Sequence, residues 1–225
     1  MQNMINPFLR KKLVILAKKL ITTDDPSHDL NHSFNVLRNT EIIAKKEGGK
    51  MLILTPAALF HDLVNIPKDH PNSKNATRES AKKTIDLLQA YPEYHDKQLQ
   101  KKIYEAIDCC SFNNRKSTVL LEAKILQDAD ALESTGAISI MRTFASVGMM
   151  KAKLFNINDP FCEKRSPSSL KYGLDLFFSR LLLVEDKMNT ITAKKIAKKR
   201  TDFLKFFLNQ LRDELPPEAF FEIES

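Results

Sequence analysis

The feature that most constrains the fold of this chain is an apolar run, residues 56–67, that carries a histidine and an aspartate side by side. Thr55 can cap a helix here and Pro56 suits its first turn, so His61 and Asp62 are predicted to lie on a helix. Burying an imidazole and a carboxylate without partners costs several kcal/mol. A divalent metal ion would ligate and neutralise both groups, and a buried His-Asp ion pair is the alternative.

The His-Asp dipeptide alone does not separate these two alternatives. It occurs twice more in the chain, at residues 28–29 and 95–96. The choice between a metal site and an ion pair therefore depends on the polar residues elsewhere in the sequence.

Apolar residues recur at helical spacing along most of the chain, and this pattern predicts an all-α fold. Only five of the 225 residues are glycine and alternating apolar-polar runs are scarce, which argues against β-sandwiches, barrels and glycine-rich nucleotide loops. Caps are expected at Asn6 and at Ser27 or Asp29, and a helix end at Gly48. The expected helices span about 7–22, 29–47, 77–90, 96–112, 119–131, 138–152, 170–188 and 192–215, with one more starting at Thr55 and loops over 66–76 and 156–168.

A chain of this length is expected to form a single domain with extensions. Its expected parts are an N-terminal helix over residues 1–22, a helical core over 23–155, and a C-terminal helical extension over 156–225 that packs on the core. No apolar stretch is long enough to span a bilayer and the N-terminus lacks a signal-peptide pattern, so we expect no membrane partner and a cytoplasmic location. The oligomeric state is not specified.

The formal net charge of +7 permits a nucleic-acid partner but does not favour one. The lysines occur in pairs such as Lys18-Lys19 and Lys82-Lys83, spread along several helical segments, which is typical of solvated helix faces. A basic surface would also attract anionic substrates. The three cysteines show no C-x-x-C spacing, so neither a disulfide framework nor a zinc knuckle is indicated.

Polar residues stand in otherwise apolar frames on three of the expected helices. They are His32 on the second, the His61-Asp62 pair on the third, and Asp128 and Asp130 in the segment I-L-Q-D-A-D-A-L. Two nitrogens and two carboxylate oxygens fill four positions of a six-coordinate divalent ion and leave two for water and a substrate oxygen. Two carboxylates would also cancel the charge of the ion.

Four blocks of sequence follow one another between residues 27 and 161: S-H-D-x-x-H, A-A-L-F-H-D-L-V-N-x-P-K-D-H-P, E-A-K-I-L-Q-D-A-D-A-L-E and G-A-I-S-I-M-R-T-F, followed by D-P-F. In this order they resemble the HD-domain superfamily of metal-dependent phosphohydrolases, and within it a bacterial subfamily of stand-alone hydrolases. The resemblance implies an HD-domain helical bundle and one divalent ion, which could be Mn, Mg, Fe, Ni, Co or Zn. The implied metal ligands are His32, His61, Asp62 and Asp130.

The family pattern A-D-x-L selects Asp130 over Asp128 as the ligand. Residues two positions apart on a helix point in directions that differ by about 200°, so both aspartates cannot easily face the same ion. Asp128 could instead anchor a loop or the imidazole of a ligand, and Asp29 could do the same or cap its helix. The resemblance implies catalysis by a metal-bound water, with Asp62 and Asp130 as candidates to orient it.

A small phosphorylated substrate, nucleotide-like by resemblance, is the expected partner. The phosphate contacts are expected from the polar loop after the central helix and from the helices beyond it, at Lys68, His70, Lys74, Arg78 and Arg142.

Relatives commonly have arginine where this chain has Asn35 and Ala131, and histidine where it has Cys110. These changes leave the metal ligands intact but weaken any claim about the substrate. They also leave open a second function, a non-catalytic helical binding protein, possibly for nucleic acid, that retains a structural metal.

Overall fold

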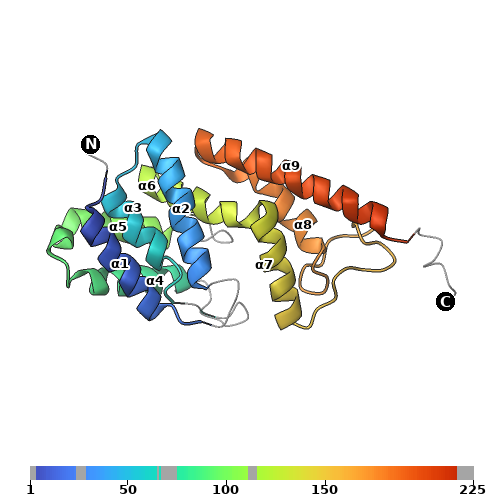
Figure 1. Cartoon of the computed structure of the whole chain (residues 1–225), viewed down its shortest axis with the longest axis horizontal. Coiled ribbons are helices and arrows are strands. Elements are labelled where there is room, and N and C mark those ends of the chain that lie inside the picture. Colours follow the sequence, from blue (N-terminus) through green and yellow to red (C-terminus); the bar gives the residue numbers. More distant parts are fainter. Residues whose placement is uncertain (1–3, 24–28, 65, 67–74, 111–115, 217–225) are drawn as a thin grey trace. The chain divides into compact units, whose positions relative to one another are not determined.

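The protein is described by a computed structural model that places residues 4–23, 29–64, 66, 75–110 and 116–216. These residues contain no β-strand, only an isolated bridge between Lys153 and Tyr172, so the expected all-α helical bundle is confirmed (Figure 1). The helices are α1 (Pro7–Leu20), α2 (Leu30–Glu47), α3 (Met51–Phe60), α4 (Ala76–Leu88), α5 (Lys97–Asp108), α6 (Leu121–Ala131), α7 (Gly136–Met149), α8 (Asp175–Ser179) and α9 (Ile191–Glu214), with short 3-10 helices at Pro92–Tyr94, Leu132–Ser134, Leu181–Leu183 and Glu185–Lys187.

Within this single helical fold the chain divides into two compact units. The first contains Met1–Leu132 and Asn189–Ala193, and the second contains Glu133–Met188 and Lys194–Ser225. All the residues that the sequence predicts as metal ligands belong to the first unit. None of the helices in the described ranges is both long enough and apolar enough to cross a membrane.

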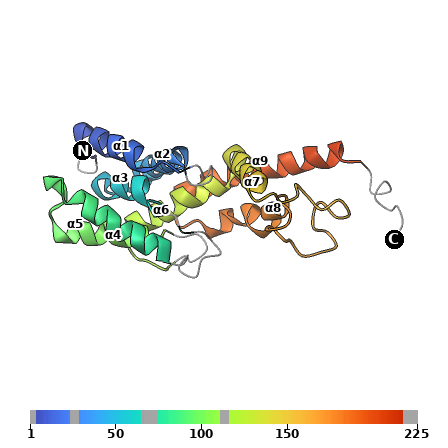
Figure 2. The ribbon, with the colours of Figure 1, turned by 90° about the horizontal axis from the view of Figure 1, so that it is seen from below.

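In the first unit, α3 is the central helix. It packs against α1, α2, α4, α5 and α6, and Figure 2 shows it between a layer of α1 and α2 and a layer of α4 and α5. Ile53, Leu54 and residues 57–60 are at most 1% exposed. Burial of such side chains is the main favourable term in folding, so the end of α3 is held firmly.

The first two helices begin and end where local chemistry predicts. Asn6 caps α1, and its Oδ1 accepts a hydrogen bond from the N–H of Phe8 at 2.8 Å. Asp29 caps α2, which ends at Gly48 with a φ of 95° in the left-handed region. The predicted start and end of the second helix are therefore confirmed.

The prediction that the central helix starts at Thr55 is wrong. α3 already begins at Met51, so Pro56 lies inside the helix rather than in its first turn. Proline removes one helical hydrogen bond, and the burial of nearly the whole helix offsets that loss. As a consequence, His61 and Asp62 directly follow the last helical residue instead of lying mid-helix.

The prediction of a long helix over residues 170–188 is also wrong. The structure has only the short α8 and two 3-10 helices there. Gly173 donates its N–H to the carbonyl of Lys153 at 2.9 Å, and a Cβ at Gly173 would overlap the side chain of Val147. Contacts with residues distant in the sequence therefore hold this segment out of a helix, which helical periodicity does not reveal.

The core of the second unit combines an apolar cluster with one buried ion pair. Leu174, Phe177, Leu181, Leu204 and Leu208 form the cluster. The side chain of Asp175 is fully buried and accepts hydrogen bonds from the Arg165 guanidinium, one of them at 2.7 Å, and from the N–H of Ser168. Such bonds are what make burial of a carboxylate tolerable.

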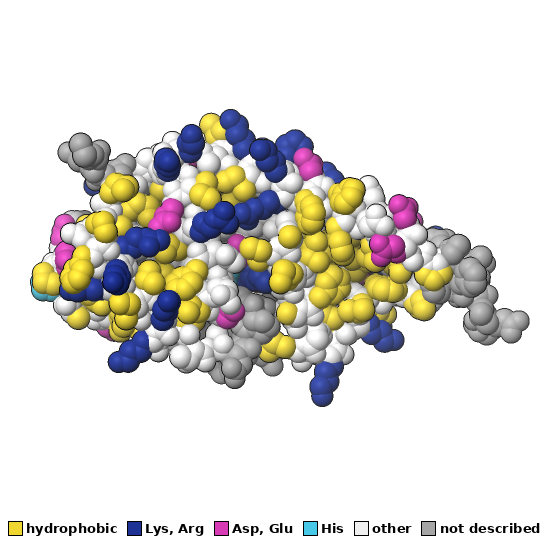
Figure 3. Space-filling model, in the orientation of Figure 1, with side chains coloured by type: hydrophobic (Ala, Val, Ile, Leu, Met, Phe, Trp, Pro, Cys, Tyr) yellow, Lys and Arg dark blue, Asp and Glu magenta, His cyan; other side chains and the backbone are white. Residues whose placement is uncertain are grey.

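One face of the molecule shows how its basic side chains are distributed. On the face drawn in Figure 3, Lys and Arg side chains are scattered among apolar and polar ones rather than gathered into one stripe. This distribution is typical of solvated helix faces.

Candidate metal centre

Local hydrogen bonds hold His32 and His61 in place. His32 lies in the first turn of α2, where its backbone N–H donates to Oδ1 of Asp29 at 2.9 Å. Nδ1 of His61 lies 2.9 Å from the carbonyl oxygen of Ala58. A carbonyl can only accept, so Nδ1 of His61 carries the proton and Nε2 presents its lone pair to the opposite side.

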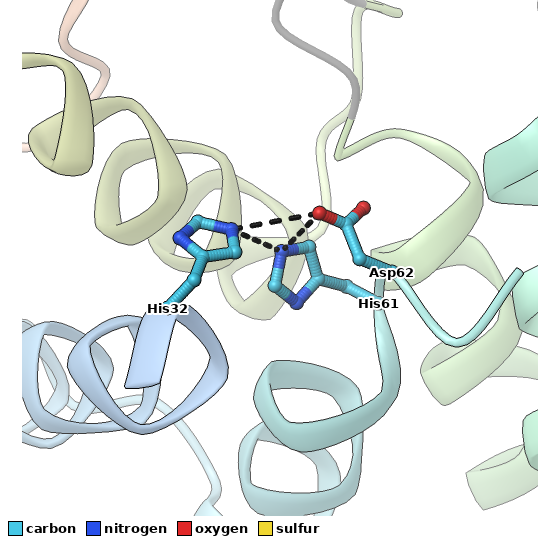
Figure 4. A group of neighbouring side chains, drawn as sticks. All are labelled: His32, His61 and Asp62. Carbon is cyan, nitrogen blue, oxygen red and sulfur yellow. Dashed lines mark hydrogen bonds and ion pairs between the residues drawn. The ribbon is translucent and has the colours of Figure 1, made fainter. Parts of the chain in front are cut away.

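The side chains of His32, His61 and Asp62 point toward one another from α2 and from the end of α3 (Figure 4). The two Nε2 atoms lie 3.3 Å apart. Oδ2 of Asp62 lies 3.5 Å from Nε2 of His32 and 3.4 Å from Nε2 of His61. These three residues could hold a metal ion, because each offers a ligand atom within 4.8 Å of the others.

Asp130, on α6, brings a fourth ligand atom to the same place. Its Oδ1 lies 3.5 Å from Nε2 of His32 and 3.8 Å from Nε2 of His61. Atoms that occupy neighbouring positions around an ion, each bound at 2.0–2.3 Å, are roughly 2.8–3.8 Å apart. The measured nitrogen–nitrogen and nitrogen–oxygen separations fall in this range. His32, His61 and Asp62 form a group that could hold one divalent ion, and Asp130 lies close enough to both imidazoles to be a candidate fourth ligand.

Asp128, two residues earlier on α6, is directed elsewhere. Its fully buried carboxylate accepts four hydrogen bonds of 2.8–2.9 Å, from the N–H and side-chain amide of Asn189 and from the N–H and hydroxyl of Thr190. Asp128 therefore anchors the segment that leads into α9, and Asp130 is the aspartate that faces the histidines.

The electrostatics of the helix ends also favour a cation here. Asp130 lies in the last turn of α6, and Asp62 lies just beyond the end of α3. A helix C-terminus carries partial negative charge, so a carboxylate beside it is destabilised unless a cation compensates. Two such ends and two carboxylates lie beside two imidazole nitrogens, and a divalent ion placed there would balance the negative charge.

The cluster is buried on its histidine side and accessible on its carboxylate side. The side chains of His32 and His61 are each 2% exposed, whereas those of Asp62 and Asp130 are 28% and 20% exposed. The carboxylate side of the cluster is therefore the side that solvent reaches, while the imidazoles stay buried.

The predicted phosphate-binding residues are placed only in part. Lys68, His70 and Lys74 lie outside the described residues. Arg78 is exposed near the start of α4. Arg142 belongs to the second unit, where its Nη1 donates to the carbonyl of Glu133 at 3.2 Å.

The three positions that depart from the family pattern differ in exposure. Ala131 and Cys110 are each 2% exposed, and Asn35 is half-buried one turn after His32. An arginine at position 131 would have no room unless neighbouring groups moved, so Ala131 belongs to the packed interior of the first unit.

The sequence interpretation missed one buried polar residue on the helix that carries His32. Asn39, on α2, is 3% exposed, and its amide donates to the carbonyl oxygen of Ala129 on α6 at 3.2 Å. The available signal was its spacing, because a residue seven positions after His32 lies on the same face of the helix.

Comparison with known proteins identifies similar chains. A family model described as the HD domain matches residues 29–135. The Bacillus subtilis protein YpgQ is 28% identical over 204 residues, which cover 89% of this chain and 90% of that protein.

Solved structures of similar proteins share the fold. The crystal structure of Bacillus subtilis YpgQ in complex with ADP superimposes with a TM-score of 0.73 at 25% identity, covering 93% of this chain and 99% of that chain. An HD-superfamily hydrolase from Bacillus thuringiensis gives a TM-score of 0.68 at 27% identity, covering 92% and 96% of the two chains. The Lin1889 protein from Listeria innocua gives 0.66 at 28% identity, covering 98% and 100%.

Proposed function

The chain belongs to the HD-domain superfamily, and on that premise we propose that it is a metal-dependent phosphohydrolase that acts on a nucleotide-like phosphoester or phosphoanhydride. The observation that supports the proposal is the group of His32, His61 and Asp62, which could hold a metal ion, together with the approach of Asp130 to both imidazoles; the nitrogen–oxygen separations are 3.4–3.8 Å.

The histidines and the aspartates of the cluster would have different roles, because they differ in charge and in exposure to solvent. His32 and His61 supply neutral nitrogen ligands from the buried side, and Asp62 and Asp130 supply the two negative charges that balance a divalent ion. When bound, the ion lowers the pKa of a water molecule and polarises a phosphoryl oxygen. The carboxylates border the accessible side, where their remaining oxygens can accept a hydrogen bond from the attacking water and orient it.

The proposal of a nucleotide-like substrate rests on a relative. The Bacillus subtilis YpgQ structure was solved in complex with ADP, and that protein aligns with 93% of this chain. Nucleoside phosphates also suit a chain with a net charge of +7, because such a surface raises the local concentration of anions.

The first experiment measures metal content and turnover together. Protein stripped with a chelator is reloaded with Mn, Mg, Fe, Ni, Co or Zn, and bound metal is determined by elemental analysis. Each form is then assayed for phosphate release from nucleoside mono-, di- and triphosphates. We expect about one ion per chain and turnover of at least one nucleotide, and both should be lost in Asp62→Asn.

A matched variant separates the site from general effects of charge. Asp86 is exposed on α4, so Asp86→Asn removes the same charge without touching the cluster and should keep both metal and activity. Bound metal without turnover of any phosphoester would contradict the proposal. Oligonucleotide binding that falls steeply with salt would, in that case, support the non-catalytic binding protein.

A further inference from the structure

Asn39 is a buried amide at the seam between two helices that carry predicted ligands. α2 carries His32 at its start, and α6 carries Asp130 in its last turn. The side chain of Asn39 bridges these helices, because its Nδ2 donates to the carbonyl oxygen of Ala129 at 3.2 Å. The residue that accepts this hydrogen bond immediately precedes Asp130 in the chain.

The spacing along α2 makes this bridge a geometric restraint. Seven residues separate His32 from Asn39, which is close to two helical turns, so both side chains leave the same face about 10 Å apart. One contact on this face is the hydrogen bond to Ala129, and the other is the 3.5 Å approach of Nε2 of His32 to Oδ1 of Asp130. Because α2 contacts α6 at both His32 and Asn39, these two contacts together determine how far α6 is shifted along the axis of α2.

A polar side chain at this position needs a physical reason. Burying an amide between two helices lowers stability unless the amide forms hydrogen bonds there that replace those it made with water. An apolar residue of the same size would be buried without this cost. A hydrogen bond has direction and a narrow range of length, whereas apolar packing tolerates sliding. The amide therefore suits the task of fixing the register of α2 against α6.

We propose that Asn39 is a positioning residue for the metal centre: its hydrogen bond to the Ala129 carbonyl holds the Asp130 carboxylate at the distance from His32 that lets both residues bind the same ion. The inference rests on the proposed function for the presence of that ion. Asp128, through its four hydrogen bonds to Asn189 and Thr190, restrains the same turn of α6 from the other side.

The test compares two buried amides that each donate to a backbone carbonyl. Asn39→Leu removes the bridge to Ala129. Gln100→Leu removes the hydrogen bond of 2.8 Å from Gln100, on α5, to the carbonyl of Tyr94 in the 3-10 helix before it. Both amides are at most 6% exposed, so both variants should lose similar stability. Thermal unfolding of the chelator-treated proteins measures that loss.

The decisive readout is metal binding without substrate. Competition with a chromogenic chelator should show affinity about 10- to 100-fold weaker for Asn39→Leu and unchanged for Gln100→Leu. With Co(II), the visible absorption band of Asn39→Leu should shift, because that band reports the geometry of the ligands. Where Asn39→Leu fails to fold, Asn39→Ser replaces it, since its hydroxyl is too short to reach the Ala129 carbonyl.

The outcomes separate this inference from the proposed function. Wild-type affinity and an unchanged cobalt spectrum in the Asn39 variant, or an equal loss of affinity in Gln100→Leu, would overturn the positioning role. A wild-type protein that binds the ion but turns over no phosphoester would overturn only the phosphohydrolase. A wild-type protein with no affinity for any divalent ion would overturn both.

Discussion

Replacing Asp128 by asparagine should strongly destabilise the first unit. Each oxygen of this fully buried carboxylate accepts two hydrogen bonds, Oδ1 from Asn189 and Oδ2 from Thr190. All four partners are donors. An amide has one oxygen and one NH2 group. With the NH2 group on the Thr190 side, the Thr190 hydroxyl can turn and accept from it, but the N–H of Thr190 then faces a donor and loses its acceptor.

The expected magnitude follows from the number and kind of those bonds. A hydrogen bond to a charged group contributes about 1.5–3 kcal/mol, so the loss of the bond from the Thr190 N–H predicts a destabilisation of at least about 1.5–3 kcal/mol. Native domains are stable by only about 5–15 kcal/mol, so the effect is a large fraction of the whole. The exposed Asp202 offers a control, because its ion pair with Lys198 lies on the surface and Asp202→Asn should change stability by less than about 1 kcal/mol.

Urea unfolding followed by far-UV circular dichroism measures both variants, with a chelator present so that metal binding does not contribute. The midpoint and the slope together give the free energy of unfolding. A loss smaller than about 1 kcal/mol in Asp128→Asn, with an unchanged slope, would refute the account of Asp128 as the anchor of the segment before α9.

Three further outcomes are expected. A divalent ion at about 100 times its dissociation constant should stabilise the wild type by about 2.7 kcal/mol, and thermal unfolding should show this gain lost in His61→Ala but kept in His95→Ala, whose ring is exposed. Gly173→Ala should destabilise by about 1–3 kcal/mol because the new Cβ overlaps Val147, whereas Gly148→Ala, with open space around the added methyl, should stabilise by up to about 1 kcal/mol in denaturant unfolding. Burial alone would raise the pKa of Asp175, but hydrogen bonds from its guanidinium partner and a backbone N–H outweigh burial and hold that pKa below its ordinary value. Its contribution to stability is therefore complete above the unfolded pKa of about 3.9 and is lost as the pH falls through the lower folded pKa, so acid titration of stability should be shallower in Asp175→Asn than in the wild type.

The sequence by itself determined the features that depend on local chemistry. Asn6, Asp29 and Gly48 act within a few residues of their own positions, so the ends of α1 and α2 could be predicted from residue type. The order of His32, the His61-Asp62 pair and Asp130 likewise indicated a candidate metal site, because four polar groups in apolar frames need a common partner. The role of these four residues as ligands remains a prediction that metal analysis will test.

Only the tertiary structure decided what depends on contacts between distant residues. Pro56 lies inside α3 because burial of that helix offsets a missing hydrogen bond, and residues 170–188 are not one helix because Gly173 pairs with Lys153 instead. The bridge from Asn39 to Ala129 joins residues 90 positions apart. Local propensity is worth about 1 kcal/mol for a glycine and about 3 kcal/mol for a proline inside a helix, and burial of several apolar side chains together exceeds either value. The contacts that decide these positions lie far away in the sequence, so the pattern of neighbouring residues did not reveal them.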